Sequence, residues 1–334
     1  MSNTVSVEAF TQQAREFLER NAERKEAAKA FVWGEGSDNV AMFEERSREA
    51  EMEVLRKAKE WQATRFDNGF GWITGPTQYG GAGLTPAHER AYNGVERDYR
   101  TPSLGVFQIG LGMVAPTILA HATDTARDLY LKKMWRADIV GCQLFSEPAA
   151  GSDLASLQTK AVRDGDEWVI TGQKVWTSGA HYSDIGEIIC RTDADLPKHK
   201  GLTGFIVDMH APGVEVRPLR QMTGGASFNE VFFNEVRVRD DMRLGDVHGG
   251  WSVALTTLMN ERVSIGGTIP ARGTGTISHA MKVWSDLPQE SRDPATRDEL
   301  MKLWIRAELL RLTNIRANQQ RKMGSPGPEG SIGK

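Results

Sequence analysis

The stretch from Gly141 to Asp153 has the residue types that suit an anion-binding loop. It begins as a short apolar run, breaks at Glu147-Pro148, and continues as a loop of small residues from Ala149 to Ser152. Small side chains let backbone N–H groups approach a bulky anion closely. The same pattern is also compatible with an ordinary turn after a strand, and this stretch alone favours neither interpretation.

A second candidate for chemistry is the carboxylate of Glu261. The helix expected from Trp251 to Gly267 carries one stripe of residues at helical spacing: Ala254, Leu258, Glu261 and Ile265. Apolar surroundings desolvate a carboxylate and make it a stronger base, which is the property that proton abstraction requires. The alternative is structural, with Glu261 in an ion pair with Arg262 or another partner.

The composition is that of a soluble globular protein with two or three domains. The 334 residues are 40% hydrophobic and 25% charged, with a formal net charge of -3, and they predict neither a membrane span nor a basic face for nucleic acid. Met1 to Val5 lacks the layout of a signal peptide. Cys142 and Cys190 lie in apolar runs, and the seven histidines show no zinc-ligand spacing. We therefore expect a cytoplasmic protein with buried thiols and without a structural metal.

Hydrophobic periodicity divides the chain into three segments. Residues 1–140 have helical spacing, and their expected helices are Glu8 to Lys29, Met42 to Arg65, one that starts at Thr85-Pro86, an apolar stretch from Leu104 to Ala122, and one from Thr123 to Arg136. Residues 246–334 return to helical spacing, with a helix that runs to Ala280, a polar linker from Ser285 to Arg297, and a helix from Asp298 to Arg321.

Between these segments, residues 141–245 have the pattern of β-strands. The expected strands are Gln158 to Arg163, Trp168 to Gly172, Gly186 to Arg191, Thr203 to Met209, Val214 to Pro218 and Phe228 to Val238. Turn formers rather than helices separate them, which favours an antiparallel barrel or sandwich. The predicted fold is α+β, with an N-terminal helical domain (1–140), a middle antiparallel β domain (141–245) and a C-terminal helical bundle (246–334) that stops before it is complete.

The order of these segments and several motifs resemble the acyl-CoA dehydrogenase family. In chain order the motifs are Tyr79-Gly80-Gly81-Ala82-Gly83-Leu84, Ser146-Glu147-Pro148-Ala149-Ala150-Gly151-Ser152-Asp153, Gly172-Gln173-Lys174-Val175-Trp176-Thr177-Ser178-Gly179-Ala180, Gly213-Val214, Phe228-Asn229-Glu230-Val231-Phe232-Phe233 and Gly249-Gly250-Trp251. Because separate motifs agree in order, the resemblance is specific and covers essentially the whole chain.

The resemblance implies an FAD site between the middle β domain and the C-terminal helices. The cofactor-binding residues that it implies are Gln143, Phe145, Ser146, Gly151, Ser152, Trp176, Thr177 and Ser178. Phe145 would pack on the isoalloxazine ring, Trp176 would lie behind it, and Ser146 would donate to its pyrimidine edge. Ser178 would place a hydroxyl near N5, and Ser152 would also contact the phosphate and pantetheine end of the ligand. Aromatic walls and short donors suit a planar ring that gains negative charge, although a core aromatic is the simplest interpretation of Trp176 alone.

The implied reaction is α,β-dehydrogenation of an acyl-CoA to the trans-2-enoyl-CoA. Glu261 would take the α-proton, and N5 of FAD would accept the hydride. Arg262 would contact the substrate or orient nearby backbone, and a purely structural role for it is the alternative. An electron-transfer flavoprotein would be the electron acceptor, and the chain would form a homo- or hetero-oligomer. The alternatives are a non-catalytic or accessory subunit of a heteromeric acyl-CoA dehydrogenase, and an acyl-CoA oxidase.

Some features depart from the family pattern. The chain stops before the family's final helices, which hold a second possible position of the base, and Trp284 to Arg297 lacks an Arg-x-x-Phe-Gly segment. Ser178-Gly179 replaces the commoner Thr-Asn pair. Three further groups have simple structural interpretations: Gly80 to Gly83 as a turn that could also line an acyl pocket, His181 as a satisfied strand-end histidine, and Lys198 to Lys200 as a solvated hairpin tip.

Overall fold

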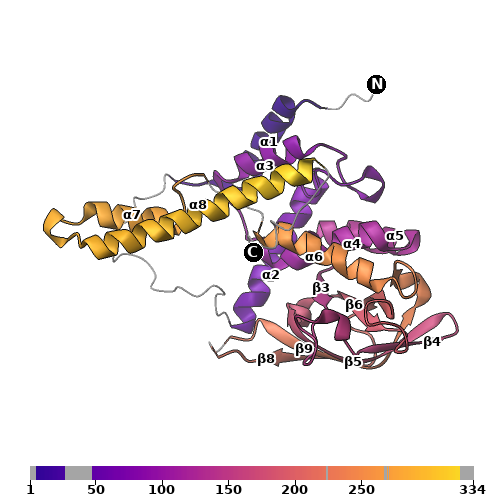
Figure 1. The fold of residues 1–334 in the computed structure, drawn as a ribbon. Coiled ribbons are helices and arrows are strands. Elements are labelled where there is room, and N and C mark those ends of the chain that lie inside the picture. Colours follow the sequence, from indigo (N-terminus) through magenta and orange to yellow (C-terminus); the bar gives the residue numbers. More distant parts are fainter. Residues whose placement is uncertain (1–4, 27–46, 223–224, 267–268, 270, 324–334) are drawn as a thin grey trace. The chain divides into compact units, whose positions relative to one another are not determined.

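The computed structural model describes residues 5–26, 47–222, 225–266, 269 and 271–323, which fall into two compact units (Figure 1). Unit 1 holds the described residues up to Leu258, and unit 2 holds those from Met259 onward. Helices, then strands, then helices follow one another along the chain as predicted. The predicted helix 8–29 ends earlier than expected, at Asn21, and Glu23–Arg24 form a short strand; residues 27–29 and the start of the predicted helix 42–65 lie outside the described residues.

Four helices of unit 1 begin after residues that can cap them: α1 (Val7–Asn21), α2 (Arg48–Asp67), α3 (Pro86–Glu96) and α5 (Asp124–Arg136). A fifth, α4 (Ala115–His121), follows Val114 without a capping side chain. Ser6, Ser47 and Thr123 each accept a hydrogen bond from a backbone N–H in the first turn. Thr85 and His88 form a reciprocal capping box with Pro86 at the start of α3. The predicted starts at Thr85-Pro86 and Thr123 are therefore confirmed.

The apolar stretch before α4 is not one regular helix. A 3₁₀ turn (Gly105–Phe107) and a π-helical turn (Gly110–Val114) precede α4. Gly110 allows this segment to approach the sheet, because a Cβ at this position would lie 3.1 Å from the carbonyl oxygen of Gly141. The π-helical turn is therefore fixed against the strand that leads into the candidate loop.

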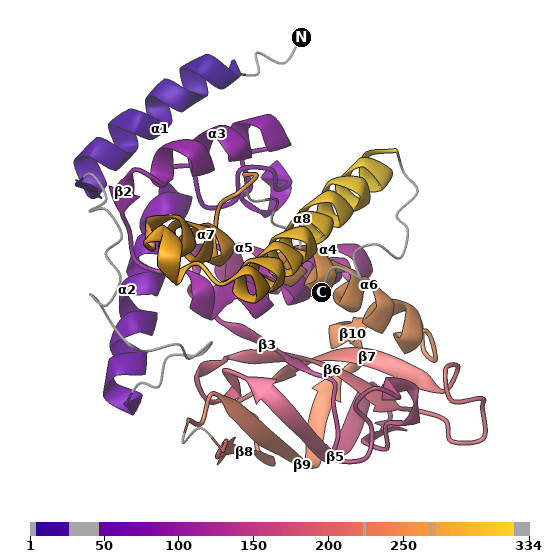
Figure 2. The same ribbon diagram turned by 60° about the vertical axis from the view of Figure 1, so that its left-hand side comes forward.

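Unit 1 also contains a mixed sheet in the order β10-β7-β6-β4-β5-β9-β8, with β3 added beside β6 (Figure 2). Its strands are β3 (Gly141–Leu144), β4 (Lys160–Asp164), β5 (Glu167–Ser178), β6 (Ile185–Arg191), β7 (Leu202–Asp208), β8 (Val214–Leu219), β9 (Phe228–Arg239) and β10 (Arg243–Leu244). Most pairs are antiparallel, but β6 pairs in parallel with β3 and with the start of β4. A separate two-stranded sheet joins β1 (Glu23–Arg24) to β2 (Tyr99–Arg100).

The predicted strand positions are confirmed with one instructive exception. The sequence suggested an end at Gly172, whereas β5 continues to Ser178. Its pairing with β9 shifts register at Gly172 and again between Lys174 and Thr177, and it resumes after each shift. A glycine inside a strand pattern can mark a bulge instead of an end, and here it does.

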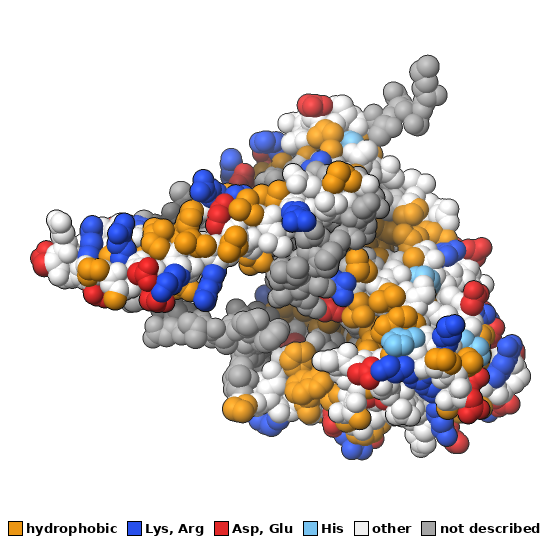
Figure 3. All heavy atoms as spheres, in the orientation of Figure 1, with side chains coloured by type: hydrophobic (Ala, Val, Ile, Leu, Met, Phe, Trp, Pro, Cys, Tyr) orange, Lys and Arg blue, Asp and Glu red, His pale blue; other side chains and the backbone are white. Residues whose placement is uncertain are grey.

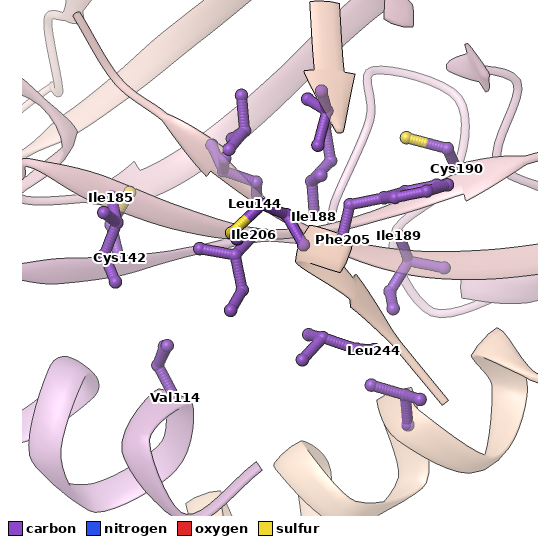
Figure 4. Packing of buried hydrophobic residues seen from close by; sticks show 14 of the residues in the cluster. Val114, Cys142, Leu144, Ile185, Ile188, Ile189, Cys190, Phe205, Ile206 and Leu244 are labelled. Atoms are coloured by element: carbon purple, nitrogen blue, oxygen red, sulfur yellow. The ribbon is translucent and has the colours of Figure 1, made fainter. Parts of the chain in front are cut away.

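The core of unit 1 is formed where the inner strands meet the helices (Figure 4). Leu144, Ile188 and Phe205 from three neighbouring strands are fully buried, and Val114 approaches them from the helical side. Cys142 and Cys190 are both buried and free of a disulfide, as the sequence predicts. Apart from this core, an aromatic cluster that includes Phe10, Phe17, Phe70 and Tyr92 holds α1 to α3.

The C-terminal helices differ from the prediction in their bounds. α6 spans Gly250–Gly266 and does not run to Ala280; a turn with Gly273 and Gly275 precedes α7 (Thr276–Asp286). α8 (Pro294–Lys322) begins within the predicted linker, at a proline, which suits the first turn of a helix. α7 and α8 pack on each other in unit 2. None of the described helices combines the length and apolarity needed to cross a membrane.

Unit 1 buries a carboxyl group, that of Glu187 in β6, with one hydroxyl as its hydrogen-bond partner. Glu187 is 0% exposed, and its Oε1 accepts a hydrogen bond of 2.5 Å from Thr257 Oγ1 on α6. Its Oε2 is buried without a hydrogen-bond partner among the described residues. Thr257 Oγ1 also lies 2.8 Å from Thr117 Oγ1 of α4. Burial raises the pKa of Glu187 to about 8, and the hydrogen bond from Thr257 opposes this effect.

The raised pKa of Glu187 predicts a specific pH dependence of stability. Between pH 4.5 and about 8 the folded protein keeps a proton that the unfolded chain has lost. The free energy of unfolding should therefore fall by roughly 1.4 kcal/mol per pH unit across this window. Glu187→Gln should lack that decline in urea unfolding curves measured at several pH values, while the exposed-site control Glu89→Gln should keep it. Parallel curves for Glu187→Gln and the parent would show that Glu187 is ionised in the folded protein.

Candidate functional site

The structure brings the two predicted cofactor-binding segments together in unit 1. The backbone N–H of Val175 in β5 donates a hydrogen bond of 2.8 Å to the carbonyl oxygen of Ser146, directly after β3. This bond places the loop Ser146–Ser152 beside the segment Trp176–Ser178. We call these two segments together the candidate wall.

A buried ion pair fixes the loop of the candidate wall. The ammonium group of Lys174, fully buried in β5, lies 2.9 Å from Glu147 Oε1. It also donates to the carbonyl oxygens of Phe145 at 3.0 Å and Ile189 at 2.9 Å. Its three N–H groups therefore have three oxygen acceptors, which is the full capacity of a charged lysine.

Glu147 is equally well satisfied. Its carboxylate accepts hydrogen bonds from the backbone N–H groups of Gln158 at 2.6 Å and Thr159 at 2.9 Å, in addition to the one from Lys174. Burial alone would raise the pKa of Glu147, but the Lys174 charge and these hydrogen bonds outweigh it and lower that pKa. Burial lowers the pKa of Lys174, and the Glu147 charge opposes this shift. With all donors and acceptors matched, we conclude that both groups are charged.

The loop that follows Glu147 is tightly closed and faces outward. Glu147 and Ala150 exchange two backbone hydrogen bonds of 3.0 and 3.1 Å. Gly151 and Ser152 are exposed, and a Cβ at Gly151 would meet no atom within 4 Å. The predicted open loop of small residues is therefore present, and its Ser152 hydroxyl is accessible to a ligand.

The hairpin tip at Lys198 to Lys200 makes specific contacts with neighbouring residues. The Lys198 ammonium lies 2.8 Å from both carboxylate oxygens of Asp153, next to the loop. The ring of His199 packs edge-on against Trp251 with centroids 4.7 Å apart. These residues remain on the surface, and Lys198 is about half exposed.

Trp176 is the most unusual residue of the candidate wall. Its backbone has a φ of 61°, in the left-handed region that a bulky residue rarely adopts. Its side chain is 58% exposed, and its ring meets Phe228 edge-on at 5.7 Å. The bulge in β5 thus turns a large aromatic ring outward, at a cost in backbone strain that typically marks a functional position. The core-aromatic interpretation of Trp176 is wrong.

Two predicted cofactor contacts are not available as side chains. Phe145 is 5% exposed, and its ring lies in the hydrophobic core, so it offers no open face for stacking. Thr177 is 1% exposed, and its Oγ1 is buried without a hydrogen-bond partner among the described residues. Strand alternation explains Thr177, because the side chains of Trp176 and Ser178 on either side of it point to the opposite face. Gln143, Ser146 and Ser178 are partly exposed.

The predicted base and its neighbour lie on α6. Glu261 and Arg262 are partly exposed and belong to unit 2, whereas the candidate wall belongs to unit 1. Arg262 Nη1 lies 3.1 Å from the sulfur of Met259 on the same helix. Of the predicted apolar stripe, Ala254 is buried and Leu258 partly buried, and the side chain of Ile265 lies outside the described residues. The roles of Glu261 and Arg262 remain predictions.

The residue types of the candidate wall suit a planar heteroaromatic group. An outward aromatic ring at Trp176, with hydroxyl groups at Ser146 and Ser178, offers an apolar surface and polar contacts to a planar heteroaromatic group. The open loop at Gly151 and Ser152 leaves room for a phosphate-bearing ligand. The pair of Lys174 and Glu147 was not predicted from the sequence. The available signal was a lysine and a glutamate, each within an apolar run.

The pair predicts a large loss of stability when it is broken. Lys174→Met should lower the free energy of unfolding by about 3–5 kcal/mol, because it leaves Glu147 buried without its cation. Glu147→Gln should also destabilise, and the double variant should lose less than the sum of the two single variants. Lys198→Met, which breaks the exposed pair with Asp153, is the matched control and should cost no more than about 1 kcal/mol. Additive losses in urea unfolding would contradict a coupled buried pair.

Comparison with known proteins gives a consistent result. Family models match in chain order: the N-terminal domain of acyl-CoA dehydrogenase over residues 5–138, the middle domain over 142–236 and the C-terminal domain over 248–334. Acyl-CoA dehydrogenase IpdE1 of Mycobacterium tuberculosis is 33% identical over 332 residues, which cover 97% of this chain and 80% of IpdE1.

Two further similarities differ in extent. Acyl-CoA dehydrogenase FadE34 of Mycobacterium tuberculosis is 46% identical over 224 residues, 66% of this chain, and the match spans only 30% of the length of FadE34. The solved structure of the Tcur3481-Tcur3483 steroid ACAD has a TM-score of 0.66 and 28% identity, and the match covers 84% of this chain and 74% of that one. The three domain matches and the IpdE1 similarity lead to one conclusion: this chain belongs to the acyl-CoA dehydrogenase family, whose members are FAD-dependent oxidoreductases.

Proposed function

We propose that this chain binds FAD on the candidate wall and catalyses α,β-dehydrogenation of an acyl-CoA thioester to the trans-2-enoyl-CoA. The observation that carries this proposal is the outward ring of Trp176, held on a left-handed backbone beside the small-residue loop. Folding alone does not explain a solvent-exposed tryptophan on a strained strand. A planar cofactor ring that covers the Trp176 side chain would explain it.

The residues of the candidate wall bind and orient the cofactor. Trp176 supplies the apolar surface, and the hydroxyl of Ser178 lies on the same face of β5, two residues on. Ser146 supplies a second hydroxyl from the loop. Bound FAD would supply the acceptor for the hydride that leaves the β-carbon. Gly151 and Ser152 leave space for the phosphate groups of the ligands, with the Ser152 hydroxyl as a donor.

Glu261 is the proposed base for the α-proton. Its carboxylate belongs to α6, a regular helix, so its position is better defined than it would be on a loop. Proton abstraction next to a thioester carbonyl requires a carboxylate within hydrogen-bond reach of that carbon. Arg262, the next residue, is the proposed substrate contact.

Replacement of Glu261 tests this role directly. Glu261→Gln should retain FAD but reduce its flavin with acyl-CoA at least about 100-fold more slowly, since a positioned base typically contributes 10²–10⁴-fold. The rate is read from anaerobic bleaching of the flavin absorbance in a stopped-flow instrument, across a panel of acyl-CoA thioesters. Glu290→Gln, at an exposed glutamate of unit 2, is the control and should bleach at the parent rate. Equal rates for Glu261→Gln and the parent would rule out Glu261 as the base.

A second candidate function is that of one subunit in a heteromeric enzyme. The Tcur3481-Tcur3483 structure is named for two components and for a steroid substrate class. The helix α8 of this chain exposes five large apolar side chains: Leu303, Ile305, Leu309, Leu310 and Leu312. Apolar side chains gather on the surface of the pair of helices α7 and α8 in Figure 3. Apolar surface of this kind is commonly buried against another protein. A steroid-like acyl group is accordingly a sensible member of the thioester panel.

Purification distinguishes the two candidates. A yellow protein that acyl-CoA bleaches without any other chain is an enzyme by itself. A colourless protein that gains flavin and activity only with a related chain is a subunit. In either case an electron-transfer flavoprotein is the proposed electron acceptor, and a cytoplasmic location stays a prediction.

A further inference from the structure

A histidine directly after β5 connects the candidate wall to the start of α2. His181 lies in a short 3₁₀ turn (Ala180–Tyr182), and its side chain is 9% exposed. Its Nε2 lies 2.8 Å from Glu51 Oε2, in the first turn of α2. A carboxylate only accepts hydrogen bonds, so Nε2 donates its proton to Glu51, and in the neutral ring Nδ1 is left as an acceptor.

The acceptor nitrogen of His181 faces a buried amide. Asn229 of β9 is 0% exposed, and its Nδ2 lies 2.9 Å from His181 Nδ1. The same Nδ2 donates a hydrogen bond of 3.0 Å to the carbonyl oxygen of Thr177. The two amide hydrogens of Asn229 thus have one acceptor each. Asn229 Oδ1 also lies 3.2 Å from His181 Nδ1, and the bond from Nδ2 to the Thr177 carbonyl sets which way the amide is turned.

The carbonyl that Asn229 binds belongs to the peptide bond between Thr177 and Ser178. At this point the ladder between β5 and β9 has just resumed after the bulge, with Thr177 opposite Asn229. The left-handed backbone of Trp176 is the residue before it. A strained residue persists only where its neighbours hold it firmly, and the side-chain bond to the Thr177 carbonyl is one such restraint.

Glu51 is itself held in position. Arg48 Nη1 lies 3.2 Å from Glu51 Oε2, and Arg48 Nη2 donates to the carbonyl oxygen of His181 at 3.3 Å. The ring of Tyr182 packs edge-on against His181 with centroids 4.7 Å apart. The histidine is therefore oriented by charged groups on α2 and by an aromatic neighbour in its own turn.

We propose that His181 is a positioning residue for the flavin: through Asn229 it sets the Thr177 carbonyl and thereby the geometry of Trp176 and Ser178, and it takes its own orientation from Glu51. This proposal rests on the proposed flavin site. It gives α2 a role in orienting His181, although α2 contributes no residue to the candidate wall. The chain Glu51–His181–Asn229–Thr177 lies within unit 1.

The test compares His181→Ala with His88→Ala. His88 is a matched control because it is also a buried histidine with a partner at each ring nitrogen, but it belongs to α3: its Nδ1 accepts from the Thr85 N–H, and its Nε2 donates to the carbonyl oxygen of Val5. Both variants should lower the melting temperature. Only His181→Ala should weaken FAD binding, by at least tenfold in a titration of the deflavinated protein, and change the visible circular dichroism of the bound flavin. Equal effects of the two variants on FAD would overturn the proposal.

Variants of Glu51 test whether Glu51 affects FAD binding through His181. Glu51→Gln keeps an oxygen acceptor for Nε2–H and should retain the parent FAD affinity, whereas Glu51→Ala should reproduce the loss seen in His181→Ala. The double variant Glu51→Ala with His181→Ala should lose no more affinity than either single variant, because the two residues act in one chain. Additive losses would show that Glu51 does not act through His181.

Hydrogen exchange of the flavin-free protein separates this proposal from the proposed function. Backbone amides of residues 176–178 should exchange faster in His181→Ala than in His88→Ala, whether or not FAD binds. If the parent protein binds no FAD but this difference is seen, the proposed function fails, while His181 is still shown to position the backbone of residues 176–178. If exchange at these residues is the same in both variants, the positioning role is wrong.

Discussion

The geometry of the candidate wall depends on the ammonium group of Lys174. This one side chain joins the end of β3 at the Phe145 carbonyl, the middle of β6 at the Ile189 carbonyl, and the loop at Glu147. Two buried charges are expensive to desolvate, and an apolar pair of similar size can be as stable. An apolar pair would however leave the N–H groups of Gln158 and Thr159 without the acceptor that Glu147 gives them. The value of the pair therefore lies in fixing one loop conformation.

A fixed loop allows strain to be kept in the neighbouring strand. Left-handed backbone at a tryptophan costs about 1–3 kcal/mol, which would relax if either side of the bulge were loose. On one side the Val175 N–H is bound to Ser146, and on the other side Thr177 is bound through Asn229. The bulge thus lies between two anchored peptides. The Trp176 ring points outward as a result of these restraints, because the side chains of the neighbouring strand residues turn inward into the core.

The sequence predicted the architecture well and the orientation of side chains less well. Turn formers and periodicity located the strands, and capping residues located the starts of α3 and α5, because these signals are local. Phe145 and Thr177 were assigned to the ligand from motifs, yet both point into the core. A bulge changes which residues face outward. No local sequence pattern marks the second register shift of β5, between Lys174 and Thr177. The pairing of Lys174 with Glu147 joins segments far apart in the chain and needed the fold to be seen.

The two buried glutamates of unit 1 show how the same side chain can have opposite electrostatic roles. Glu147 keeps its charge because a cation and two N–H groups bind it, whereas the carboxyl of Glu187 accepts from one hydroxyl and has a raised pKa. The ion pair of Lys174 and Glu147 has no net charge next to the loop of the candidate wall. The groups left to respond to negative charge on a bound ring are then the dipoles of the wall itself, above all the hydroxyls of Ser146 and Ser178. Dipoles held by a rigid scaffold stabilise such charge without reorganising, so the precision of β5 and the loop is a functional requirement as well as a structural one.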